Sequence, residues 1–177
     1  MLKLFARFAK NHDGLAALEF ALIAPLMIVL FYGAVELSTA IDCKSRVNRV
    51  GFTVADLVAQ SSAVSSADTT NVFNCANAIL YPYASGNAKI IVSSLVDNGK
   101  GGATVAWSDA QNTSARSKGT TMTVPAGLIT SGSGGSVIYG EISYSFTAPI
   151  TYFLGGPITL TSSFYAKPRR STTVTHT

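Results

Sequence analysis

The residues that could take part in chemistry are few and scattered. The chain of 177 residues has nine acidic residues, two cysteines (Cys43 and Cys75) and two histidines, His12 and His176, which lie close to its two ends. A serine nucleophile needs a histidine base, and a zinc site needs closely spaced ligands. The glycine-rich stretch 132–135 lacks the lysine of a phosphate-binding loop. We therefore expect no catalytic residue, no metal site, no cofactor and no small-molecule substrate, and we can nominate no residue for a hydrolase.

One carboxylate stands out because of its surroundings. Glu19 lies near the start of an apolar run from Leu15 to Val35, which as a helix is long enough to cross a hydrocarbon core of about 30 Å. A charge deep in such a span costs roughly 2.5–3.5 kcal/mol on insertion scales, and less near its end. Hydration at headgroup level would be enough to explain Glu19 alone. The glycine five residues before it (Gly14) and the aromatic residue after it (Phe20) indicate a more specific role.

This N-terminal block resembles the class III signal of type IV-like prepilins. In that signal a short basic leader ends in glycine, and the mature chain has glutamate at its fifth position, followed by an aromatic residue. Cleavage after Gly14 makes Leu15 the first residue, and it places Glu19 at position five and Phe20 in the aromatic position. The resemblance implies processing by a prepilin peptidase between Gly14 and Leu15, with residues 1–14 as the leader.

The arrangement has a physical use. Cleavage would free an α-amino group on Leu15, about one helical turn before Glu19. In a bundle of such helices, the carboxylate of one subunit can pair with the ammonium of its neighbour. A low-dielectric setting tolerates that pair and strongly disfavours an unpaired charge. We expect Glu19 and Phe20 to set the register in which pilin helices pack.

Charges around the span predict its orientation. Lys3, Arg7 and Lys10 precede the apolar run, and basic residues in this place hold the N-terminus in the cytoplasm. The chain is thus expected to cross the inner membrane once, with its C-terminal domain in the periplasm or outside the cell. The net charge is +4, and the leader contributes +2 of it through three basic residues and one acidic residue. We expect no nucleic-acid partner. The C-terminal cluster of Lys167, Arg169 and Arg170 is expected to be solvated.

The two cysteines would then lie in an oxidising compartment, where disulfides persist. A bond between Cys43 and Cys75 would stabilise the fold by roughly 3–4 kcal/mol in the chain-entropy model. Two separate, buried and reduced thiols are the alternative.

The elements that would position these residues begin with one long helix over residues 15–60. Residues 15–36 form the span, where Pro25 is tolerated. Residues 37–60 continue as an amphipathic helix, and Glu36 at the junction is expected to be hydrated. Apolar residues recur there at spacings near three and four: Leu37, Ile41, Val47, Val50, Val54, Leu57 and Val58.

The rest, residues 61–177, is expected to form an extracytoplasmic α+β domain. After a linker over 60–67, a helix begins with Asp68 as its N-cap and ends before Pro82. Alternation and β-rich composition predict strands over 88–96, 103–108, 120–124, 136–146 and 158–166, with a turn at 98–102. These strands are expected to form a small antiparallel sheet whose apolar face covers the amphipathic helix. Their order stays open.

Taken together, residues 14–22, Pro25 and residues 33–37 resemble the TadE/TadG-like family, the pseudopilins or minor pilins of tight-adherence (Flp-type) pilus systems. The resemblance covers about residues 10–60. It implies an adhesion-related pilus assembly component that helps to initiate or support assembly. The implied partners are the prepilin peptidase, the inner membrane, and other pilins that pack against the N-terminal helix.

A second hypothesis is an anchored or secreted binding or adhesion domain. In that case residues 1–40 are an ordinary targeting segment cut after Ala40, or an anchor that is not cut. The mature N-terminus (Leu15, Ile41 or Met1) discriminates between these hypotheses.

Overall fold

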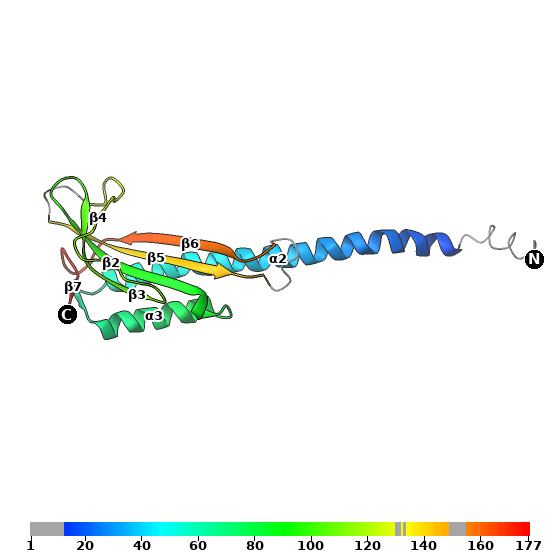
Figure 1. Ribbon diagram of the computed structural model, residues 1–177, viewed down its shortest axis with the longest axis horizontal. Helices are drawn as coiled ribbons and strands as arrows, with labels where there is room; N and C mark the ends of the chain where they lie inside the picture. The colour runs from blue at the N-terminus through cyan, green and yellow to red at the C-terminus, as the bar shows by residue number, and fades with distance from the viewer. Residues whose placement is uncertain (1–12, 130–131, 133, 149–154) are drawn as a thin grey trace, which may run out of the picture.

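The computed structural model describes residues 13–129, 132, 134–148 and 155–177. Most of the expected leader, residues 1–12, lies outside this part. The first described element is helix α2 (Asp13–Ala59), a single helix of 47 residues that contains Pro25. At 1.5 Å per residue it is about 70 Å long. The predicted long helix is confirmed, and Figure 1 shows that its first half extends well beyond the rest of the molecule.

The two halves of α2 differ in burial. The segment from Gly14 to Ala59 is long and apolar enough to cross a membrane, and none of its most apolar window is buried within the protein. In the second half Val47, Val50, Val54 and Val58 are buried. The predicted amphipathic continuation is therefore confirmed, because one stripe of the helix packs on the domain while the first half packs on nothing in the described chain. Leu37 and Ile41, which were expected in that stripe, are 58% and 61% exposed. The expectation was wrong for these two residues, because the buried stripe runs through Ala40 and Cys43 instead.

A five-stranded sheet packs along the second half of α2. Its strands lie in the order β4-β3-β2-β5-β6, and every pairing is antiparallel. The bounds are β2 (Ala88–Asp97), β3 (Ala103–Gln111), β4 (Thr121–Met122), β5 (Ser136–Phe146) and β6 (Ile158–Ala166). The predicted α+β class is confirmed, and β5 and β6 lie alongside the helix (Figure 1).

The contact between helix and sheet is closest at two glycines. A Cβ atom on Gly140 of β5 would lie 2.9 Å from the backbone oxygen of Gly51 on α2. A Cβ on Gly51 would lie 3.1 Å from the hydroxyl of Ser162 on β6. Around this point the α2-facing residues of β5, Ile138 and Ile142, are buried. Gly51 costs helix propensity, but a larger residue there would press on the Ser162 side chain, and Gly140 lets the strand backbone meet the helix backbone.

The second helix, α3 (Ser66–Leu80), begins three residues earlier than predicted. Its N-cap is Ser65, and Asp68 occupies the third helical position. The Ser65 hydroxyl accepts from the Asp68 backbone N–H (3.3 Å), and the Asp68 carboxylate accepts from the Ser65 N–H (2.9 Å). Asp68 as the N-cap was therefore wrong, because the two residues form a reciprocal capping box. Phe73, Ala76 and Leu80 form the buried face.

Two short strands join the ends of the domain. Within the expected linker, β1 (Ala63–Val64) pairs in parallel with β7 (Thr175–His176). The returning C-terminal segment also closes the end of α2, since the Arg169 N–H donates to the Ala59 carbonyl (2.9 Å). The Arg169 guanidinium pairs with Asp56, and Lys167, Arg169 and Arg170 are all exposed, as expected for a solvated cluster. The short 3-10 helix η1 (Ser85–Asn87) leads into β2.

Candidate functional site: the exposed N-terminal half of α2

The residues singled out from the sequence lie in the first turns of α2. Leu15 is 57% exposed and Phe20 is 73% exposed. Glu19 is also exposed, and a Cβ on Gly14 would have no atom within 4 Å. Because Leu15 and Glu19 are four residues apart, their side chains lie on one face of the helix. A carboxylate on this surface is available to a partner helix.

Glu36 does not have the hydrated environment that we expected. It is 1% exposed, and it is the first residue of the buried stripe of α2, which continues at Ala40, Cys43 and Val47. Spacings of four, three and four residues place these side chains on the same helix face. The folded domain therefore begins directly at the end of the expected span.

Cys43 and Cys75 are separate free thiols in the structure, and the disulfide is not formed. Cys43 is fully buried, whereas Cys75 is exposed. Burial raises the pKa of the Cys43 thiol to about 11, because an apolar environment disfavours the thiolate. The arrangement corresponds to the alternative of two separate thiols, except that Cys75 is not buried.

A polar junction that the sequence analysis missed fixes the end of α3 to α2. Arg46 donates from Nε to Asp42 (2.9 Å) and from Nη1 to the Tyr81 carbonyl (2.6 Å), just past the last residue of α3. Tyr83 donates its hydroxyl to Asp42 (3.0 Å). The Arg46 hydrogen bond holds the pKa of Asp42 below its usual value, and burial together with Asp42 raises the pKa of Tyr83 to about 12. The spacing of Asp42 and Arg46 was a signal for an ion pair.

An open cavity lies beside β3 and β7, and no residue of α2 lines it. It has a volume of about 600 Å³, and Trp107, Asp109 and His176 contribute to its wall. His176 Nε2 lies 2.9 Å from Asp109 Oδ2. The sequence analysis noted only that His176 lies close to the end of the chain, and it missed this contact because only the pairing of β1 with β7 brings the residue there. Within the described residues, no group of three or more His, Cys, Asp or Glu side chains could hold a metal ion.

These features define an α+β protein with one long helix that is apolar enough to be a single membrane anchor. The model of the TadE-like protein family matches residues 14–56, so the N-terminal segment of the chain is similar to that family. The match ends within α2, so it includes neither α3 nor the sheet. This is the family that the sequence analysis associates with tight-adherence pili. A search of curated proteins and a search of solved structures found no match.

Proposed function

We propose that this protein is a minor pilin, or pseudopilin, which helps to initiate or support assembly of a tight-adherence pilus. The observation that carries the proposal is the exposure of the whole apolar half of α2. Twenty-odd apolar residues in one helix need lipid or protein around them, since exposure of each large side chain to water costs about 1.5–3 kcal/mol. A pilin uses both environments, first the inner membrane and then other pilin helices.

The proposal divides the chain in a definite way. Residues 1–14 are the leader, residues 15–36 span the inner membrane, and residues 37–177 lie outside the cytoplasm. The burial of Glu36 supports this boundary from the domain side, because the packed stripe of α2 starts at that residue. The basic residues before the span support the orientation.

Glu19 gives the assembly its register. A free ammonium on Leu15 of one subunit pairs with the exposed Glu19 carboxylate of the next. In an apolar helix bundle a charge that is out of register has no partner, so misaligned packing is disfavoured. The partners required are the prepilin peptidase and other pilins with a similar helix.

The mature N-terminus tests the proposal, by mass spectrometry of protein from cells with and without the prepilin peptidase. A start at Leu15 that depends on the peptidase supports the proposal. A start at Met1 or Ile41 contradicts it and favours an anchored or secreted binding domain. The fold already argues against a mature N-terminus at Ile41, because cleavage after Ala40 would remove Glu36 and Ala40 from the buried stripe of α2.

A further inference from the structure

We propose that the cavity beside β3 and β7 binds an acidic sugar unit of an extracellular polysaccharide. Five residues in its wall come from three parts of the chain: Trp107 and Asp109 on β3, Arg116 and Lys118 on the loop before β4, and His176 on β7. The cavity of about 600 Å³ is open to solvent. That volume falls in the usual range for small-ligand sites.

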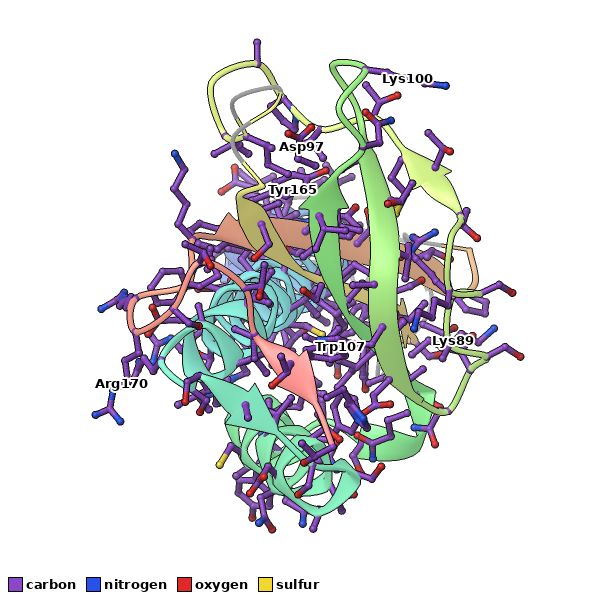
Figure 2. The ribbon with its side chains drawn as sticks, turned by 90° about the vertical axis from the view of Figure 1, so that its left-hand side faces the viewer. Lys89, Asp97, Lys100, Trp107, Tyr165 and Arg170 are labelled. Carbon is purple, nitrogen blue, oxygen red and sulfur yellow. The ribbon has the colours of Figure 1, made fainter. Side chains whose placement is uncertain are left out.

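The aromatic wall of the cavity is held in a fixed orientation. The Trp107 indole N–H donates to the Val174 carbonyl (2.7 Å), and the Trp107 ring lies against the His176 ring with 5.2 Å between centroids. Figure 2 shows Trp107 beside β7. An indole held in place offers a flat apolar surface at little cost in conformational entropy, and the apolar face of a pyranose ring matches such a surface.

The charges in the wall leave an excess of positive charge. The Asp109 carboxylate already interacts with the Thr69 hydroxyl (2.6 Å) and with His176 (2.9 Å). Arg116 pairs through Nη2 with Glu141 (2.5 Å), while its buried Nε has no hydrogen-bond partner in the described part of the chain. Lys118 is exposed, and the described residues provide no ion pair for it. Lys118 is thus the cation that a ligand carboxylate can reach.

This combination selects one class of ligand. A uronate-type sugar has an apolar ring face for Trp107, hydroxyls for the Asp109 carboxylate, and a carboxylate for Lys118. A neutral sugar would leave Lys118 without a partner. A long nucleic acid would need cations spread along a track, whereas Lys100 and Arg170 lie well apart from Trp107 (Figure 2) and do not line the cavity.

The chain provides its own reporter for the test. Trp107 is its only tryptophan, so indole fluorescence of the full chain in detergent micelles monitors the cavity directly. The probe is an oligogalacturonate of defined length, titrated against a neutral dextran oligomer of the same length. We expect the oligogalacturonate to change the emission saturably and the dextran to bind at least tenfold more weakly, since charge-assisted hydrogen bonds are the stronger ones.

Two lysine variants decide whether the cavity is responsible. Lys118→Gln should weaken oligogalacturonate binding about tenfold or more. Lys100→Gln removes the same charge from an exposed site on the β2–β3 turn, and it should change the affinity less than twofold. The proposal is overturned if the oligogalacturonate does not bind at millimolar concentration. It is also overturned if the dextran binds equally well, or if both variants weaken binding equally, since the attraction would then be diffuse.

Discussion

At the scale of single residues, Gly51 and Gly140 decide how closely α2 approaches the sheet. The backbones of the two elements meet at these positions, and both atoms nearest to a Cβ on Gly140 belong to backbone, at 2.9 and 3.0 Å. Neither atom can move aside as a flexible side chain would. The sequence did not reveal this contact, because the close approach of two elements leaves no trace in the periodicity of either one.

We expect Gly140→Ala to lower the free energy of unfolding by about 1–3 kcal/mol, because the added methyl group overpacks this contact. The control is Gly86→Ala. Gly86 lies in η1, and a Cβ there would have no atom within 4 Å, so the stability should stay within about 0.5 kcal/mol of the wild type. Thermal and urea unfolding of the full chain in micelles measure both. Equal stability of wild type and Gly140→Ala would contradict the close approach.

The buried Cys43 thiol makes stability depend on pH. Its pKa is raised from 9.0 to about 11, so its contribution is fully present below pH 9 and is lost as the pH rises towards 11. The loss is at most about 1.4 kcal/mol per pH unit for one proton. We expect Cys43→Ala to reduce the slope of unfolding free energy against pH between 9 and 11. Cys75→Ala, at the exposed cysteine, is the control and should keep the wild-type slope.

At the scale of elements, long helices and strands with a regular apolar pattern were predictable from the sequence. Two-residue strands and the capping box were not. Repeats near three and four residues predicted α2, and alternation predicted β5 and β6 with correct bounds. The strands β1 and β7 have two residues each, which is too short for any period, and their pairing joins segments more than a hundred residues apart. The burial of Glu36 was missed because a carboxylate beside an apolar span is normally hydrated.

The capping box at the start of α3 was missed in the sequence, and its contribution to stability can be tested. Asp68 attracted the N-cap assignment because it precedes the apolar face, whereas the box needs both Ser65 and Asp68. Ser65→Ala should destabilise the protein by about 1 kcal/mol. Ser66→Ala, one residue further and inside the helix, should have an effect below about 0.5 kcal/mol. Urea unfolding monitored by circular dichroism distinguishes the two variants. Equal losses of stability in both would argue against the capping box.

At the scale of the whole molecule, the anchor and the domain are separable. No described contact from the apolar half of α2 stabilises the domain, so a fragment of residues 36–177 should be folded and monomeric without detergent. A fragment of residues 48–177 lacks Ala40, Cys43 and Val47, which are buried, and should lose roughly 3–5 kcal/mol. Gel filtration and thermal unfolding test both fragments. Aggregation of the 36–177 fragment would show that the anchor supports the domain.

Assembly is the level at which Glu19 is expected to act. We expect Glu19→Ala to leave processing and membrane insertion intact and to reduce co-purification with partner pilins about tenfold, since a desolvated ion pair in the helix bundle is lost. Leu18→Ala is the control, because Leu18 precedes Glu19 on α2 and is also exposed. Undiminished co-purification of the Glu19 variant would remove this residue from the assembly mechanism.

The continuity of α2 also has a mechanical consequence. The first half of α2 extends beyond the domain, and the second half lies along β5 and β6 (Figure 1). The close contact at Gly51 and Gly140 holds this second half against the sheet. A tensile load applied through the N-terminal half therefore acts along the strands and shears the whole helix–sheet contact at once. It does not peel the strands apart one hydrogen bond at a time. Separating α2 from the sheet by such a load must break many contacts at the same time. The helix–sheet packing therefore resists a force applied along the N-terminal helix.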